Sequence, residues 1–296
     1  MRAPANGLEI EYEIDGPEQG PVLLLVMGLG QQLVAWPDDF VAGFVEAGFR
    51  VVRFDNRDIG LSSKIEEESR TGVVSSFLRS RFGFSVDAPY VLDDMASDAW
   101  GLMDHLSIDR FHVLGVSMGG MIAQLMAIGR PERVATLTSV MSTTGERNLP
   151  SATPKALALL ARRRPVKADR ETLIAHSLEA KRTLAGPLFP TSEEEMWAAS
   201  ARTVDRMYYA PGYRRHTLAV LASPDRRTSL QSLSVPTLVV HGTADPLVPV
   251  GHGRRTAELV PRSRLELIEG WGHDLAPGVR PRIVDWFADQ ARSHPA

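Results

Sequence analysis

Residues 115–119 read Gly115-Val116-Ser117-Met118-Gly119 and match the pattern G-x-S-x-G. The pattern follows an apolar run at 111–116 and precedes a run with helical periodicity at 118–128. A serine at a sharp turn from a strand into a helix has its hydroxyl held out of the sheet, where it can act as a nucleophile. The flanking glycines fit this prediction, because such a turn leaves no room for a Cβ beside the serine. The alternative is an ordinary turn in which Ser117 only caps the helix.

Outward from this turn, apolar strands alternate with amphipathic helices. Repetition of strand, helix and strand predicts an α/β protein whose mostly parallel, doubly wound sheet has helices on both faces. Most of the strands are continuously apolar, which favours burial on both faces. We expect strands at 8–14, 22–27, 49–54, 111–116, 134–141, 237–241 and 264–268, and helices at 38–47, 92–106, 118–128 and 282–292.

The alternation is interrupted once, between residues 145 and 227. This segment contains 15 lysine and arginine residues against nine acidic ones, whereas the rest of the chain is acidic. A basic helical insertion in an acidic core is typical of a cap, although the charge is equally explained by a solvated helical face. We expect a core formed by 1–144 and 228–296 with a helical cap or lid at 145–227. The helical patterns lie at 155–163, 170–184, 192–209 and 213–221.

An acid and a base follow the last two predicted strands. Asp245 lies in the loop after the strand at 237–241, and His273 lies in the loop after the strand at 264–268. The carboxyl ends of parallel strands share one edge of the sheet, so both side chains are expected near Ser117. A serine needs a base that takes its proton, and the chain order serine, acid, histidine fits this fold. We therefore predict a triad of Ser117, Asp245 and His273, with Asp274 as the competing acid.

Two backbone N–H groups are expected to form an oxyanion hole. One should belong to Met118, the residue after the nucleophile, and the other to the loop after an early strand. In the glycine-rich loop at 26–30 we choose the N–H of Leu29, which follows Gly28. The alternative is a glycine-rich turn that binds nothing.

Apolar side chains of the insertion are candidates for the roof of a substrate pocket. If they line a cleft, the substrate has an apolar or aromatic body; ordinary packing between helices is the alternative. The candidates are Trp197, Met207 and Tyr208, with Met196 and Tyr209 beside them.

Taken together, these motifs resemble the α/β-hydrolase superfamily over nearly the whole chain. Besides the loops already described, the resemblance rests on residues 54–62 (FDNRDIGLS). Most members have His-Gly in the first loop, where this chain has Met27-Gly28. With residues 36–38 (WPD) and 56–58 (NRD), this departure resembles the aclacinomycin methylesterase-like branch, which cleaves a methyl ester on a polyketide.

The resemblance implies a serine hydrolase that cleaves carboxylic esters through an acyl-enzyme and needs no cofactor. The expected substrates are small to medium apolar or aromatic esters, including methyl esters. Carbon–carbon bond hydrolases and lactonases use the same triad and stay open as alternatives, as does a binding protein without turnover. Haloalkane dehalogenases and most epoxide hydrolases of this fold need an aspartate at the position of Ser117.

Composition excludes several other classes of protein. The chain has 296 residues, 44% of them apolar and 23% charged, with a net charge of −3 and no cysteine. Disulfides and thiolate metal sites are therefore absent, no metal-ligand spacing is found, and no charge excess favours nucleic acid. The longest apolar run, at 21–30, is half of the ~20 residues that a membrane-spanning helix needs. Without an export signal we expect a cytoplasmic protein that acts on a small-molecule ester; the oligomeric state stays open.

Overall fold

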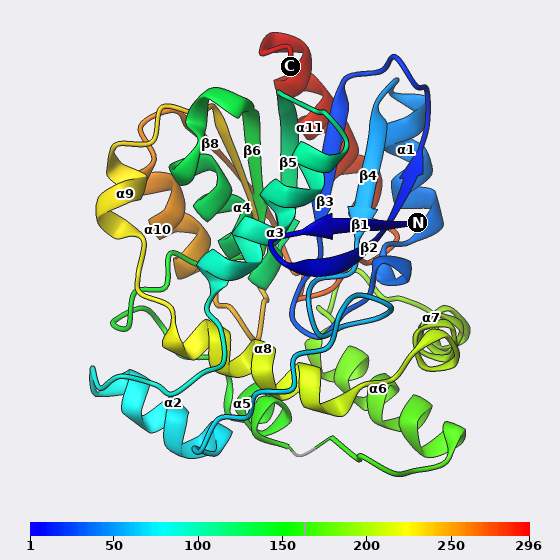
Figure 1. The fold of residues 1–296 in the computed structure, drawn as a ribbon, viewed down its shortest axis with the longest axis vertical. Helices are drawn as coiled ribbons and strands as arrows, with labels where there is room; N and C mark the ends of the chain where they lie inside the picture. Colours follow the sequence, from blue (N-terminus) through cyan, green and yellow to red (C-terminus); the bar gives the residue numbers. More distant parts are fainter. Residues whose placement is uncertain (163) are drawn as a thin grey trace.

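The computed structural model describes residues 1–162 and 164–296, and its centre is an eight-stranded sheet (Figure 1). The strand order is β1-β2-β4-β3-β5-β6-β7-β8. All neighbours from β4 to β8 are parallel, whereas β1 and β2 are antiparallel additions at one edge. The predicted mostly parallel sheet is confirmed. The strands are β1 (Arg2–Ala5), β2 (Leu8–Asp15), β3 (Val22–Val26), β4 (Arg50–Phe54), β5 (Phe111–Val116), β6 (Val134–Val140), β7 (Thr237–Gly242) and β8 (Ser263–Ile268).

Helices cover both faces of the sheet, and each face has its own buried core. Along β3, Leu24 and Val26 belong to the core that includes α3 and α4, whereas Leu23 and Leu25 belong to the core that includes α1 and α11. This two-sided burial is the reason why the strands are continuously apolar. The helices are α1 (Asp38–Glu46), α3 (Leu92–His105), α4 (Met118–Gly129), α9 (Arg227–Gln231), α10 (Gly251–Leu259) and α11 (Arg280–Ser293), with short 3-10 turns η1 (Leu33–Ala35) and η2 (Pro131–Arg133).

Between β6 and α9 the described part of the chain forms four further helices. Figure 1 shows them together beyond one end of the sheet, in the lower part of the view. Side chains of Thr153, Asp169 and Ser192 accept the N-terminal N–H groups of the first three, which explains where these helices begin. Residue 163, the end of the helix expected at 155–163, lies outside the described residues. The helices are α5 (Pro154–Ala161), α6 (Arg170–Leu184), α7 (Glu193–Arg206) and α8 (Ala210–Ala222).

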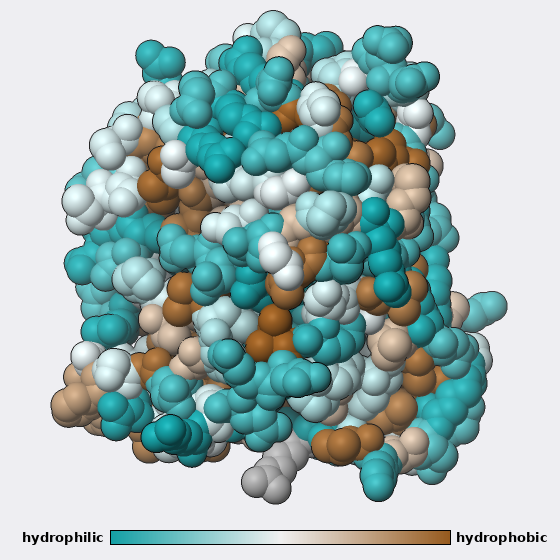
Figure 2. Space-filling model, in the orientation of Figure 1, coloured by the Kyte–Doolittle hydropathy of each residue, from teal (hydrophilic) through white to brown (hydrophobic). Residues whose placement is uncertain are grey.

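The predictions did not include β1, α9, α10 and α2 (Val73–Arg81). Two of them, β1 and α9, are only four and five residues long, and α2 and α10 bury little apolar surface. In α10 only Gly253, Thr256 and Leu259 are buried, and in α2 the large apolar side chains are exposed. Apolar side chains accordingly reach the surface at the lower left corner of Figure 2, where α2 lies.

Candidate active site

The turn between β5 and α4 holds Ser117 in a strained backbone conformation. Its φ is 55° and its ψ is −121°. Residues other than glycine rarely adopt this backbone conformation. A Cβ on Gly115 would lie 2.1 Å from the carbonyl oxygen of Gly119, and one on Gly119 would lie 2.0 Å from that of Val26. Both glycines are therefore needed for the close approach of strand, turn and helix. The Ser117 N–H donates to the Val140 carbonyl oxygen at 2.9 Å, which ties the turn to β6.

The structure brings Ser117, Asp245 and His273 together from three strand ends. Nε2 of His273 lies 2.9 Å from Ser117 Oγ, and Nδ1 of His273 lies 2.6 Å from Asp245 Oδ2. The other carboxylate oxygen, Oδ1, accepts the N–H groups of Leu247 at 2.9 Å and Val248 at 2.8 Å. Asp245 and His273 are buried. The arrangement can pass a proton from the serine hydroxyl to the imidazole while the carboxylate orients the ring.

Asp245 is held in its ionised form. Burial alone would raise the pKa of its carboxyl, but the charge of His273 and the hydrogen bonds from His241 and His273 outweigh burial, so the pKa lies well below its ordinary value. Nε2 of His241 is 3.5 Å from Asp245 Oδ2 and 2.7 Å from the Val248 carbonyl oxygen. An ionised acceptor keeps the proton of the neutral His273 ring on Nδ1 and leaves the lone pair on Nε2 for the serine proton.

Asp274, the competing acid, does not bond to His273. Its backbone carbonyl accepts the indole N–H of Trp271 at 2.8 Å. Its Oδ1 atom is buried and has no hydrogen-bond partner among the described residues. Burial raises the pKa of this carboxyl to about 6. The position opposite Nδ1 of His273 is occupied by Asp245 alone.

Leu29 and Met118 line the same cavity as Ser117 and His273. In the described part of the chain neither of their N–H groups has an acceptor outside regular secondary structure, and Met118 has no intrahelical acceptor because it is the first residue of α4. The next N–H in the loop, that of Gly30, donates to Nδ1 of His216 in α8 at 3.2 Å. Two residues that line the cavity containing the serine therefore have backbone N–H groups without an acceptor among the described residues.

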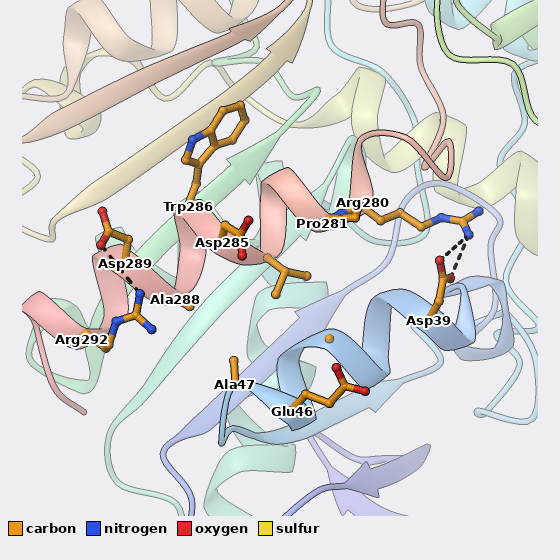
Figure 3. A pocket seen from close by; sticks show the side chains of 12 residues that line it. Asp39, Glu46, Ala47, Arg280, Pro281, Asp285, Trp286, Ala288, Asp289 and Arg292 are labelled. Carbon is orange, nitrogen blue, oxygen red and sulfur yellow. Dashed lines mark hydrogen bonds and ion pairs between the residues drawn. The ribbon is translucent and has the colours of Figure 1, made fainter.

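The cavity has a volume of about 680 Å³ and lies between the sheet and the four helices. Apolar side chains from both sides line it, among them Met27, Met121 and Met141 from the core and Leu159, Leu160, Leu184, Met196 and Tyr213 from the helices. A second hollow of about 700 Å³ lies between α1 and α11 (Figure 3) and contains none of the predicted site residues. Arg280 and Asp39, which pair at 2.8 Å, line both hollows.

The predicted roof residues Trp197, Met207 and Tyr208 do not line this cavity, so their assignment to the pocket is corrected. Trp197 is 43% exposed, and the guanidinium of Arg170 lies 5.5 Å from its ring centroid. Met207 is 38% exposed, and Tyr208 is half-buried outside the cavity lining. The neighbour Met196 faces the cavity instead, because successive residues of a helix point about 100° apart. Sequence reasoning also missed four charged lining residues of the insertion, namely Arg164, Lys181, Glu195 and Arg202.

Residues 54–62 brace the loops around the cavity. Asp55 accepts the N–H groups of Leu33 at 2.7 Å and Leu61 at 2.8 Å, and also the guanidinium of Arg206 at 2.7 Å. Asp58 accepts two hydrogen bonds from Arg215 in α8, both of 2.8 Å. Two buried carboxylates therefore join the core to α7 and α8.

The described residues offer neither a cluster of metal ligands nor a helix that could cross a membrane. No group of three or more His, Asp or Glu side chains there is arranged to hold a metal ion. None of the helices in that part of the chain has both the length and the apolar character that crossing a membrane requires.

Comparisons with known proteins agree with this geometry. A family model described as alpha/beta hydrolase fold matches residues 21–276. The chain is 29% identical to rhodomycin D methylesterase of Streptomyces peucetius, over 90% of this chain and 89% of the methylesterase. It is also 29% identical to 3-oxoadipate enol-lactonase 2 of Acinetobacter baylyi, over 90% of this chain and 86% of the lactonase. The fold is similar to that of a meta-cleavage product hydrolase from Pseudomonas fluorescens, with a TM-score of 0.73 and 18% sequence identity. The match covers 99% of this chain and 97% of the hydrolase.

Proposed function

The chain belongs to the α/β-hydrolase family, and on this basis we propose that it hydrolyses carboxylic esters through an acyl-enzyme formed on Ser117. The observation that carries the proposal is the unbroken pair of hydrogen bonds from Ser117 through His273 to Asp245. A nucleophile, a base and an orienting acid in contact are the parts that acyl transfer requires.

In the first step Ser117 Oγ attacks the ester carbonyl carbon, and His273 Nε2 takes the hydroxyl proton. The N–H groups of Leu29 and Met118 stabilise the negative oxygen of the tetrahedral intermediate. His273 then protonates the departing alcohol, and the acyl group stays on Ser117. Water, activated by the same histidine, attacks the acyl-enzyme and releases the acid. Asp245 stabilises the imidazolium in both halves of the cycle.

The proposed substrates are small to medium esters with an apolar or aromatic body, including methyl esters. The apolar lining of the cavity supports this choice, and so does the name of the relative from Streptomyces peucetius, a methylesterase. Lactone hydrolysis is the second candidate, because an enol-lactonase is also 29% identical to this chain and the triad chemistry is the same.

We assign residues 145–227 as a cap over a core formed by 1–144 and 228–296. The support for this assignment is that α5, α6 and α7 each contribute side chains to the cavity, for example Leu159, Leu184 and Met196. In this assignment the core performs the chemistry and the cap selects the substrate.

A fluorophosphonate probe and a hydrolysis screen test the proposal. The wild-type protein should be labelled, and it should hydrolyse methyl esters faster than lactones or a vinylogous diketone, a substrate for carbon–carbon cleavage. The Ser117→Ala variant should fold normally by circular dichroism, take up no probe and lose about 10^4- to 10^6-fold in kcat. A folded Ser117→Ala variant that keeps a tenth of the activity would show that Ser117 is not the nucleophile. Preferential turnover of lactones or of the diketone would replace the ester assignment.

A further inference from the structure

We infer that the cavity selects esters carrying a hydroxyl group, which Lys181 and Asp274 bind together as donor and acceptor. This inference rests on the proposed function and names the substrate class of the same site. It starts from two polar groups of the cavity wall, Lys181 Nζ and Asp274 Oδ1, for which the described residues provide no hydrogen-bond partner.

Lys181 lines the cavity from α6. Ser177, Ala180 and Leu184 line the cavity with it, at the spacing of one helix face. Among the described residues, Lys181 has no hydrogen-bond acceptor, and no carboxylate oxygen lies within 4.0 Å of its ammonium nitrogen. Burial lowers the pKa of Lys181, while the attraction of Asp274 opposes this change more than any other charge does.

The remaining charged side chains of the cavity wall, apart from the triad histidine, have partners within the described residues. Arg280 pairs with Asp39 and with Glu195. Arg202 pairs with Asp38 at 2.8 Å. The guanidinium of Arg164 lies 3.7 Å from the ring centroid of Tyr213. Arg202 keeps one buried atom, Nε, without a hydrogen-bond partner among the described residues, but Lys181 and Asp274 are the two charged side chains of this wall for which those residues provide neither an ion pair nor a cation–π contact.

Asp274 supplies the second unused group, the buried Oδ1 atom. Buried polar atoms almost always have a hydrogen-bond partner, so an exception calls for an explanation, such as a group bound there. The carboxyl, whose pKa burial raises to about 6, is mostly ionised at pH 8. No ion pair within 4.0 Å joins it to Lys181, yet the two side chains attract each other and line the same cavity.

A hydroxyl is the ligand group that fits this pair. An ammonium group only donates hydrogen bonds, an ionised carboxylate only accepts them, and a hydroxyl does both. An anion would be attracted to Lys181 but repelled by Asp274. A cation would be attracted to Asp274 but repelled by Lys181. A neutral hydroxyl satisfies both groups without adding charge to a buried site, where an uncompensated charge is costly.

Matched ester pairs test the inference. The pairs are methyl phenylacetate against its 2-, 3- and 4-hydroxy derivatives, and methyl butyrate against methyl 3-hydroxybutyrate. We expect kcat/KM for at least one hydroxylated ester to exceed that of its partner by about 100-fold, since sites built around a substrate hydroxyl discriminate strongly against its absence. The ratio should fall towards one in Lys181→Met and in Asp274→Leu, and Asp274→Asn, which keeps an acceptor oxygen, should retain part of it.

Lys167→Met is the matched control, because Lys167 is an exposed lysine of the same inserted segment and its loss changes the net charge equally. Its ratio should equal that of the wild type. Wild-type ratios near one for all pairs, or a ratio that Lys181→Met leaves unchanged, would overturn the inference. A preference for monomethyl esters of dicarboxylic acids, lost in Lys181→Met and increased in Asp274→Leu, would also overturn it in favour of an anion site.

Binding to the Ser117→Ala variant separates this inference from the proposed function. Calorimetry with the same ester pairs needs no turnover. The hydroxylated ester should bind to Ser117→Ala at least 10-fold more tightly than its partner, and this difference should disappear in the double variant that also carries Lys181→Met. If the wild type takes up no fluorophosphonate probe but this binding preference is found, the proposed hydrolysis fails and the hydroxyl site stands. If the wild type is labelled and hydrolyses esters without any hydroxyl preference, the proposed hydrolysis stands and the hydroxyl site fails.

Discussion

Nδ1 of His216 accepts the backbone N–H of Gly30 at 3.2 Å, across 186 residues of sequence. The other ring nitrogen, Nε2, lies 2.8 Å from the Arg57 carbonyl oxygen. Since Nδ1 accepts, Nε2 carries the proton and donates it to this carbonyl, so the ring is neutral. Leu29 directly precedes Gly30. Helix α8 therefore holds the loop whose N–H group we propose as an oxyanion donor.

Replacement of His216 should slow catalysis without removing a catalytic residue. In His216→Leu, Gly30 loses its acceptor and the Leu29 N–H loses its fixed direction. We expect a loss of about 10-fold in kcat with little change in KM, and a loss of about 1–3 kcal/mol in the free energy of unfolding. Steady-state kinetics and urea denaturation measure the two effects. A folded variant with wild-type kcat would show that α8 does not orient this loop.

Asp245 and Asp274 should differ sharply when each is changed to asparagine. Asp245→Asn removes the carboxylate that keeps the proton on Nδ1 of His273, so kcat should fall by about 10^4-fold. Asp274→Asn leaves the hydrogen bonds of the triad in place, and on an ester without a hydroxyl its kcat should fall far less. A severe loss for Asp274→Asn with a mild one for Asp245→Asn would reverse the assignment of the acid.

Asp274 should also make the stability of the protein depend on pH. Burial raises its pKa to about 6 in the folded state, against an ordinary value near 3.9 in the unfolded chain. Between these values the folded protein binds the proton more strongly, so this group's contribution to stability falls as the pH rises from about 4 to about 6. Asp274→Asn should therefore gain about 1–3 kcal/mol over the wild type at pH 7.5 and less at pH 4.5. Urea denaturation at the two pH values measures this, and an equal difference at both would contradict it.

Met196 and Trp197 provide a matched test of the cap. Met196 is buried and lines the cavity, whereas its neighbour Trp197 is exposed and lies outside the cavity lining. Met196→Ala should change kcat/KM for a bulky aromatic methyl ester by about 10-fold relative to a short acetate. Trp197→Ala should leave that ratio at the wild-type value. If only Trp197→Ala alters the ratio, the cavity in the active protein differs from the one described above.

Much of the fold could be predicted from local sequence patterns. Continuous apolar strands separated by amphipathic helices indicate a parallel sheet, because only burial on both faces removes the need for polar alternation. Ser117, Asp245 and His273 could be proposed together because each follows a predicted strand and parallel strands end at one edge of the sheet. Of the elements that were missed, α2 and α10 place few apolar residues in a core, and β1 and α9 are only four and five residues long.

Local chemistry was thus enough to specify most of the strands and helices and the residues that meet at the strand ends, because backbone periodicity and sheet geometry follow from it. The side of each inserted helix that faces the cavity became known from the folded molecule alone. Met196 and Trp197 are neighbours in α7 and point about 100° apart. No sequence pattern within α7 specifies which of the two faces the cavity. The contacts of Gly30 with His216 and of Asp55 with Arg206 span 186 and 151 residues. Such contacts depend on how whole helices dock onto the sheet, which is set by packing across the molecule rather than by neighbouring residues.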